Sequence, residues 1–134
     1  MIRILSDDAL VPPLDASCIA QWIKAVAAGY GFAVGEINYI FCTDERLLEV
    51  NRQFLQHDYY TDIITFDYST PSTISGDIYI SIDRVRQDAE EYKDERELYR
   101  ILIHGVLHLT GQGDKTPETR AEMTRKENLA LEML

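Results

Sequence analysis

The sequence predicts an α+β fold, in which a small mixed sheet packs with helices around one central helix. Three observations support this prediction. Short runs with the alternation or the β-branched content of strands interleave with runs whose apolar residues recur at helical spacing. One helical run near the C-terminus is apolar on almost every side, which is typical of a buried helix. The chain has 134 residues, so we expect residues 1–134 to form a single domain.

The first elements are a strand and a helix. Residues 1–5 form the predicted strand, and Asp15 is placed to cap the helix. Gly29 and Gly31 then end this helix. Its predicted buried face consists of Ile19, Trp22, Ile23, Val26 and Tyr30.

The middle of the chain predicts a strand, a helix and two more strands. Residues 36–42 are rich in β-branched and aromatic residues, and Thr43 is placed to cap the second helix. The apolar stripe of that helix is Leu47, Val50 and Phe54. Residues 62–68 and 77–82 form the next two predicted strands. In the second of these, Asp77, Tyr79 and Ser81 alternate with Ile78, Ile80 and Ile82.

Three helices complete the prediction. A short helix from Asp83 places three apolar residues inward, namely Val85, Ala89 and Tyr92. The central helix lies within residues 94–111 and is expected to be largely buried. The last helix begins after Thr116, with Pro117 at its first position.

Composition limits the functions that remain open. The net charge of −10 argues against a protein that coats nucleic acid non-specifically, because such binding needs clustered Lys and Arg. A local groove or a bound cation remains compatible with this charge. No apolar run reaches the length of a membrane span and no secretory signal is present, so we expect a cytoplasmic protein without a membrane partner. We expect Cys18 and Cys42 to be small buried residues with no disulfide partner.

Two histidines interrupt the apolar central helix. His104 and His108 are four residues apart, so their imidazoles share one face and can bind one cation. Gly111 permits a sharp turn, after which Asp114 can bring a carboxylate toward the two rings. Histidines in an apolar helix are costly unless something satisfies their nitrogens. We therefore predict a metal site formed by His104, His108 and Asp114.

The ligand types indicate the metal and its use. Three ligands of mixed nitrogen and oxygen type with an open fourth position are typical of catalytic zinc. We expect one zinc ion per chain, used to hydrolyse a polymer. The spacing equals that of a zinc-protease motif, in which the position of Gly105 holds a glutamate general base. Because glycine cannot take up a proton, a peptidase is disfavoured.

Residues 104–111, H-G-V-L-H-L-T-G, resemble the signature of the YbeY family of bacterial metalloproteins. T-D-I-I-T-F at residues 61–66 resembles the family's T-D-V-L-S-F segment, and G-D-I-Y-I-S at residues 76–81 resembles its G-D-I strand. Glu97, seven residues before the first histidine, also matches. The resemblance spans about residues 47–130 and combines several specific motifs.

The resemblance implies a cytoplasmic metal-dependent endoribonuclease, a hydrolase specific for single strands that acts in ribosome maturation and quality control. The implied partners are the ribosome and single-stranded RNA, including the 3′ end of the 16S ribosomal RNA precursor. This enzyme is our leading hypothesis. The alternative is a ribosome-associated assembly factor whose metal is mainly structural.

The chain departs from the family pattern at two positions. Asp114 stands where the family usually has a third histidine. Leu55 aligns with an arginine that in the family helps to bind phosphate, and Arg52, one helical turn earlier, is a candidate substitute.

Three further polar residues are candidates for the site. For Asn51 we favour a structural hydrogen bond, and for His57 a solvated position. Asp62 either lines the site or, as we favour, caps a turn or supports a metal ligand. The sequence assigns no general acid or base.

Overall fold

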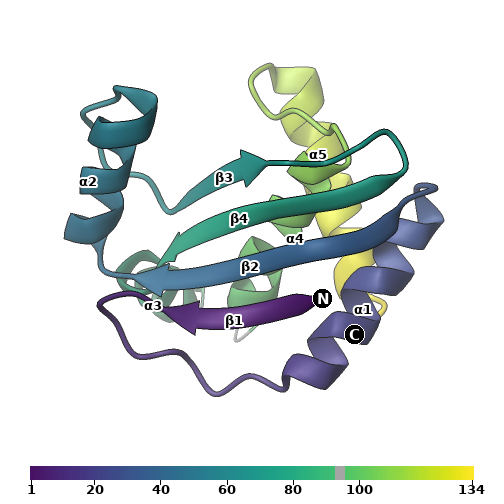
Figure 1. Ribbon diagram of the computed structural model, residues 1–134, viewed down its shortest axis with the longest axis horizontal. Coiled ribbons are helices and arrows are strands. Elements are labelled where there is room, and N and C mark those ends of the chain that lie inside the picture. Colours follow the sequence, from purple (N-terminus) through teal and green to yellow (C-terminus); the bar gives the residue numbers. More distant parts are fainter. Residues whose placement is uncertain (93–95) are drawn as a thin grey trace.

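The computed structural model describes residues 1–92 and 96–134. It confirms the predicted α+β class (Figure 1). The elements are β1 (Ile2–Ser6), α1 (Ala16–Gly29), β2 (Ala33–Cys42), α2 (Asp44–Leu55), β3 (Ile63–Asp67), β4 (Thr73–Ser81), α3 (Ile82–Tyr92), α4 (Glu97–Leu109) and α5 (Pro117–Leu131).

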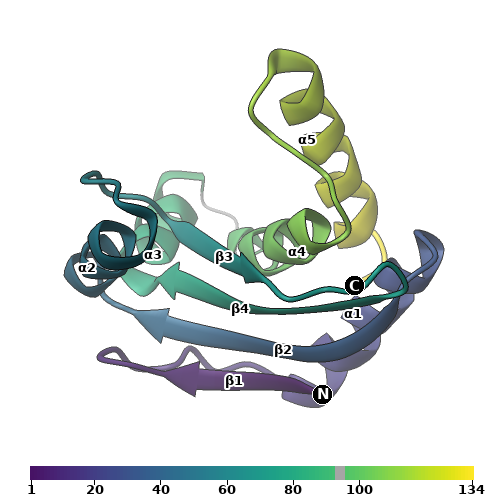
Figure 2. The same cartoon turned by 45° about the horizontal axis from the view of Figure 1, so that its top comes forward.

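The four strands form one mixed sheet in the order β1-β2-β4-β3. β1 pairs with β2 and β2 with β4 in parallel, whereas β3 pairs with β4 antiparallel. This order places β3 at an edge of the sheet. Figure 2 shows β3 running between α2 on one side and α4 on the other.

Helices α1 and α4 cover one face of the sheet, and the main core lies between them. The core-facing positions of β2 and β4 are fully buried, namely Ile37, Tyr39, Phe41, Ile74, Ile78 and Ile80. The Tyr39 hydroxyl donates to the Leu102 carbonyl at 2.8 Å, which ties the sheet to α4. Burying so much apolar surface is the main force that fixes α4 in the centre.

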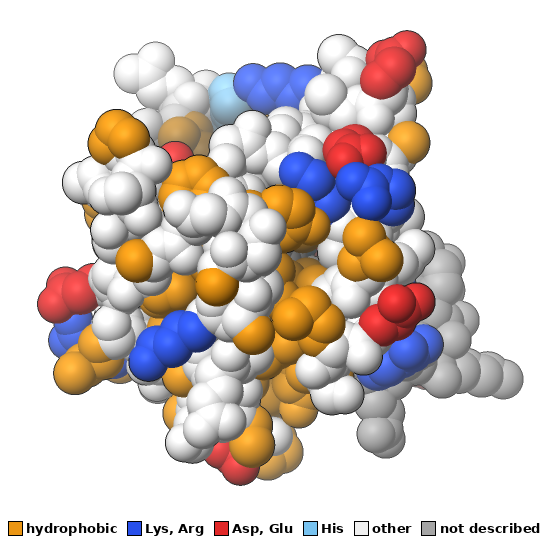
Figure 3. Space-filling view, turned by 90° about the vertical axis from the view of Figure 1, so that its right-hand side faces the viewer, with side chains coloured by type: hydrophobic (Ala, Val, Ile, Leu, Met, Phe, Trp, Pro, Cys, Tyr) orange, Lys and Arg blue, Asp and Glu red, His pale blue; other side chains and the backbone are white. Residues whose placement is uncertain are grey.

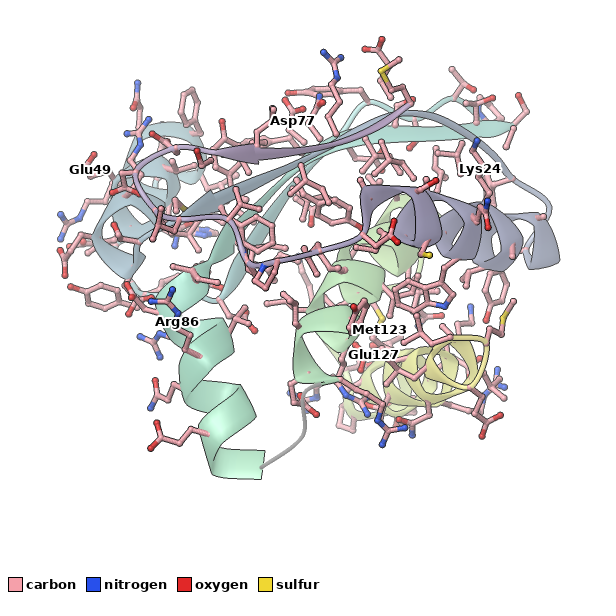
Figure 4. All side chains as sticks on the ribbon, turned by 90° about the horizontal axis from the view of Figure 1, so that it is seen from below. Lys24, Glu49, Asp77, Arg86, Met123 and Glu127 are labelled. Atoms are coloured by element: carbon pink, nitrogen blue, oxygen red, sulfur yellow. The ribbon has the colours of Figure 1, made fainter. Side chains whose placement is uncertain are left out.

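Among the described elements, α2 covers the opposite face of the sheet at one end. A small second core lies there and consists of Cys42, Leu47, Val50 and Ile64. Figure 4 shows Asp77 of β4 on the side of the sheet turned away from α4 and α5. Successive side chains of β4 therefore point to opposite faces of the sheet, as in any β-strand.

Helix α5 is held against α1 and α4. The Trp22 indole on α1 donates to the Ala130 carbonyl on α5 at 2.8 Å. The same ring meets Tyr99 of α4 edge to face, with 6.0 Å between the ring centroids. Figure 3 looks at this side of the molecule, where hydrophobic side chains gather between scattered charged ones. The position of α5 matters because it carries a residue of the site described below.

Three buried positions predicted from sequence are wrong. Phe54 is 58% exposed, because it lies at the rim of the second core, where its ring meets Phe66 edge to face. Tyr30 is the exposed C-cap residue of α1, with the Lys126 ammonium 4.8 Å from its ring centre. Cys18 is exposed in the first turn of α1, where its thiol donates to Asp15 at 3.3 Å.

Cys42 and the bounds of several elements can also be compared with the predictions. Cys42 is buried, and neither cysteine is in a disulfide. β2 and β4 begin earlier than predicted, and Ile82 belongs to α3 instead of a strand. The inward positions predicted for Ala89 and Tyr92 fall outside what the structure describes. Within the described residues, no helix has both the length and the apolarity to cross a membrane.

Candidate metal centre

Helix α4 directs two imidazoles to one point. His104 and His108 are one turn apart, and their rings meet edge to face with 4.6 Å between centroids. The two Nε2 atoms are 3.0 Å apart. Both side chains are half-buried, because one side of each ring packs on the molecule while the Nε2 edge faces a cleft.

The chain returns to these rings through a tight turn. Gly111 has a φ of +99°, a conformation that glycine adopts without steric cost. The amides of Gly111 and Gln112 donate to the carbonyls of His108 and Leu107 at 3.0 and 3.1 Å, which is a Schellman motif. Asp114 follows, and its Oδ2 atom lies 3.4 Å from the Nε2 atom of each histidine. The structure thus brings the three predicted ligands together.

Each imidazole is also held from behind. Nδ1 of His108 lies 2.9 Å from the Gln112 carbonyl, and Nδ1 of His104 lies 2.6 Å from a carboxylate oxygen of Glu127. A carbonyl or carboxylate oxygen can only accept, so both Nδ1 atoms carry the hydrogen. In the neutral rings, both Nε2 atoms therefore present bare lone pairs.

This arrangement fits a metal ion. Two lone pairs and a carboxylate oxygen meet with no donor between them, which is unfavourable unless a cation lies among them. Ligands about 2.0–2.1 Å from a tetrahedral zinc ion are about 3.3 Å apart, and the separations here are 3.0 to 3.4 Å. Among the described residues, His104, His108 and Asp114 are the one group of three ligating side chains this close.

The surroundings shift the pKa values of His104 and His108 in opposite directions. Burial acts to lower the pKa of His104, but the hydrogen bond and charge of Glu127, followed by the charge of Asp114, raise it above its usual value. Burial and the neighbouring His104 lower the pKa of His108. Without a metal, a proton therefore favours His104 over His108.

Glu127 is the buried acid of this site. Its side chain comes from α5 and is 7% exposed, and Figure 4 shows it on the side of α5 that faces α4. Its other oxygen accepts from Arg100 at 3.1 Å. Arg100 also donates to Asn128 at 2.9 Å and lies 3.4 Å from Glu97. The buried Glu127 carboxylate is therefore held in place by two partners, Arg100 and His104.

Gly105 has a packing role. A Cβ atom at this position would lie 2.9 and 3.0 Å from methyl groups of Ile78. Residue 105 therefore faces the sheet and lets α4 approach it closely. No side chain at this position could serve as a general base, in agreement with the argument against a peptidase.

The candidate metal ligands line one open cleft of about 1120 Å³. One wall comes from α4, α5 and the turn that carries Asp114. The other comes from the end of α2 and the loop before β3, with β3 between the two walls. Such a cleft can admit an extended polymer to the open position of the metal.

The three further candidate residues, Asn51, His57 and Asp62, all line this cleft but differ in role. Asn51 is 1% exposed and donates to the Tyr59 carbonyl at 2.9 Å, which confirms the predicted structural hydrogen bond. His57 is exposed, as predicted. Asp62 is exposed and lines the cleft, close enough for its charge to raise the pKa of His104.

Arg52, the candidate substitute for the family arginine, is engaged in an ion pair with Asp58 in this structure. It is not among the residues that line the cleft. Leu55 does line the cleft. At this point the chain therefore presents an apolar surface.

Sequence reasoning missed Glu127. The available signal was its spacing on the last helix, four residues after the buried Met123 and three before the buried Ala130. A carboxylate at a helical position that otherwise holds apolar residues needs a buried partner. The missed partner is the Nδ1 edge of His104.

Comparison with known proteins identifies the family of the chain. The family model described as "Endoribonuclease YbeY" matches residues 10–134. A relative of that name from Parabacteroides distasonis is 52% identical over 135 residues, which cover 99% of this chain and 95% of the relative. Another, from Phocaeicola vulgatus, is 52% identical over 136 residues, which cover 100% of this chain and 99% of the relative. A solution structure from Thermotoga maritima has a TM-score of 0.67 at 27% identity and covers 98% of this chain and 87% of that one.

Proposed function

The chain belongs to the YbeY endoribonuclease family, and we propose that it cleaves single-stranded RNA in the cleft, with one zinc ion held by His104, His108 and Asp114. The convergence of two bare imidazole nitrogens and a carboxylate oxygen carries this proposal. Family membership makes the enzyme a hydrolase of RNA, and the cleft is where that hydrolysis has room to occur.

A bound zinc ion would polarise a phosphoryl oxygen and lower the pKa of a water molecule at its open position. The residues of the chain prepare this position. Glu127 and the Gln112 carbonyl fix the two rings so that both Nε2 atoms face the cleft. Arg100 also lines the cleft, where its guanidinium is paired with Glu97 and Glu127 and holds Glu127 behind His104.

For the natural substrate we propose the 3′ end of the 16S ribosomal RNA precursor, cut during ribosome maturation and quality control. Membership of the family supports this choice. The ribosome is then the partner, and the cytoplasm is the place of action because ribosomal RNA is processed there. The net charge of −10 supports a localised contact with RNA over binding across the whole surface.

The test compares strand cleavage by the wild-type protein and two variants. His108→Ala removes a proposed ligand, and Tyr68→Ala, an exposed residue outside the cleft lining, is the control. We expect the wild type and Tyr68→Ala to cut a single-stranded RNA ending in the 16S 3′ sequence, with little cutting of its duplex. His108→Ala should lose both zinc, measured by elemental analysis, and cleavage.

Three results would count against the proposal. Cleavage by His108→Ala at the wild-type rate would show that the proposed metal ligand is not required for the reaction. Equal cutting of duplex and single strand would remove the strand specificity. A wild type that binds ribosomes but cuts no RNA would favour an assembly factor with a structural metal.

A further inference from the structure

The cleft wall opposite the candidate metal ligands carries an aromatic pair. The rings of His57 and Tyr59 stack with 5.1 Å between their centroids and 20° between their planes. Nδ1 of His57 and the Tyr59 hydroxyl share a hydrogen bond of 3.0 Å. Both residues line the cleft, yet Tyr59 is 55% exposed. The Tyr59 ring is therefore held in place by His57, while more than half of the residue stays exposed.

The backbone under this pair is clamped by one buried residue. The Asn51 side chain donates to the Tyr59 carbonyl at 2.9 Å, and the Asn51 carbonyl accepts from the His57 amide at 3.2 Å. Asn51 thus holds the backbone on both sides of Asp58. An exposed aromatic ring on a fixed backbone costs little conformational entropy when it binds a flat partner.

The charges in the cleft indicate what that partner is. Leu55, which lines the same cleft, is apolar, and Arg52 is paired with Asp58 and does not line the cleft. This wall therefore offers a phosphate little positive charge. It offers aromatic and apolar surface, which suits the face of a nucleobase. The opposite wall holds Arg100 and the ligands of the proposed zinc ion, and that ion would attract a phosphate.

We infer that Tyr59, stacked on His57, is a base-stacking platform that binds one nucleobase of the single-stranded RNA while a phosphate lies at the metal centre. This inference rests on the proposed function. A base can stack only when it is unpaired, so the platform would also help to exclude duplex RNA. Stacking needs no base-edge hydrogen bonds, so it would tolerate different sequences.

The test is an abasic scan of a short single-stranded oligonucleotide, and gel electrophoresis after each measurement verifies that the oligonucleotide is uncut. Each base is removed in turn, and dissociation constants are measured by fluorescence anisotropy with zinc-loaded protein. In the wild type, loss of the base at one position should weaken binding by about fivefold to a hundredfold. In Tyr59→Leu the intact oligonucleotide should already bind this weakly, and loss of that base should add nothing.

Matched variants separate stacking from a general change in the protein. Tyr59→Phe keeps the ring and should bind within about threefold of the wild type. Tyr68→Ala removes a tyrosine that is 64% exposed outside the cleft lining, and should behave like the wild type. Circular dichroism and zinc content should be unchanged in all three variants.

The platform is overturned if Tyr59→Leu binds as tightly as the wild type, or if the same abasic position still weakens binding by the same factor in Tyr59→Leu. Cleavage assays of the same variants separate this failure from failure of the proposed function. If the wild type cuts single-stranded RNA and His108→Ala does not, only the platform is lost. If the wild type neither binds nor cuts RNA, both proposals are lost.

Discussion

The carboxylate of Glu127 on α5 lies 2.6 Å from Nδ1 of His104 on α4. This contact links the last helix of the chain to the candidate metal centre. A carboxylate behind a ligating histidine fixes the orientation of the ring and increases its basicity. Glu127 is therefore a positioning residue, which would act on the proposed metal ion through His104.

The first prediction concerns this contact. In Glu127→Gln, the amide keeps the shape of the side chain but removes its negative charge. We expect zinc affinity to fall by about 10- to 100-fold, the usual effect of losing such a partner. Competition with a chelator of known affinity measures this change directly, without an activity assay.

Glu118→Gln is the matched control, because Glu118 is exposed in the first turn of the same helix. It should bind zinc as the wild type does. Equal zinc affinity in Glu127→Gln and Glu118→Gln would show that Glu127 serves only the packing of α5 on α4.

A second prediction concerns the unusual third ligand. Asp114→His restores the set of three histidines that the family resemblance implies. Because imidazole is a good zinc ligand, this variant should still bind one zinc ion, whereas Asp114→Ala should bind it more weakly. Calorimetric titration measures both. If Asp114→His bound no zinc, residue 114 would not face the metal.

A third prediction follows from the opposite pKa shifts of His104 and His108. In the metal-free protein, we expect the His104 imidazole to titrate above the ordinary histidine pKa of about 6.5 and His108 below it. The raised pKa of His104 means that its protonation stabilises the metal-free fold below about pH 6.5. That contribution is lost as the pH rises through the raised value.

Zinc binding should show the opposite trend with pH, because the proton on His104 competes with the metal. Zinc affinity should therefore decrease as the pH falls through the raised pKa of His104. Nuclear magnetic resonance of the imidazole signals, assigned with single His variants, measures the two pKa values. A His108 signal that titrates above the His104 signal would contradict this account.

The fold was largely predictable because its signals are local. Asp15 and Thr43 cap helices as predicted, since a cap depends on residues two or three positions away. The buried face of α4 follows from apolar periodicity alone. The failures at Phe54 and Cys18 share one cause. A hydrophobic side chain becomes buried only if another element covers it, and the sequence does not say where the sheet ends.

The site was predictable only where its residues are close in sequence. His104, His108 and Asp114 lie within eleven residues, and their spacing on a helix and its exit turn brings them together. Glu127 reaches His104 because Trp22 and its contacts hold α5 in place. That relationship depends on tertiary packing, so no short motif contains it.

A fourth prediction concerns Gly76, the glycine of the G-D-I segment. A Cβ atom here would lie 2.5 Å from the Phe66 carbonyl oxygen and 2.9 Å from a methyl group of Leu109. Gly76→Ala should therefore destabilise the fold by about 1–3 kcal/mol, the usual cost of overpacking. Chemical denaturation measures this loss.

Gly113→Ala is the control, because a Cβ atom at Gly113 would meet nothing within 4 Å. Its free energy of unfolding should change by less than about 0.5 kcal/mol. Equal stability of the two variants would mean that β3 and α4 do not approach Gly76 as closely as described.

The last prediction concerns how an acidic protein binds RNA. Arg100 and Lys115 are the basic residues among the cleft lining, and Arg100 is already paired with Glu97 and Glu127. The protein itself therefore neutralises few phosphates. Each phosphate neutralised in a single strand contributes about −0.7 to the slope of log affinity against log salt. We expect a shallow slope, roughly that of two to four phosphates.

The metal should then supply much of the attraction. Binding of a short single-stranded RNA, measured by fluorescence anisotropy across a salt series, should weaken markedly when zinc is chelated. Lys24→Ala, on the outer side of α1, should leave both the slope and the chelator effect unchanged. A steep slope with no chelator effect would instead place the RNA on a basic surface outside the cleft. The metal would then support the fold and take no part in binding RNA, whereas a metal that binds phosphate is expected here because the acidic cleft without a cation would repel RNA.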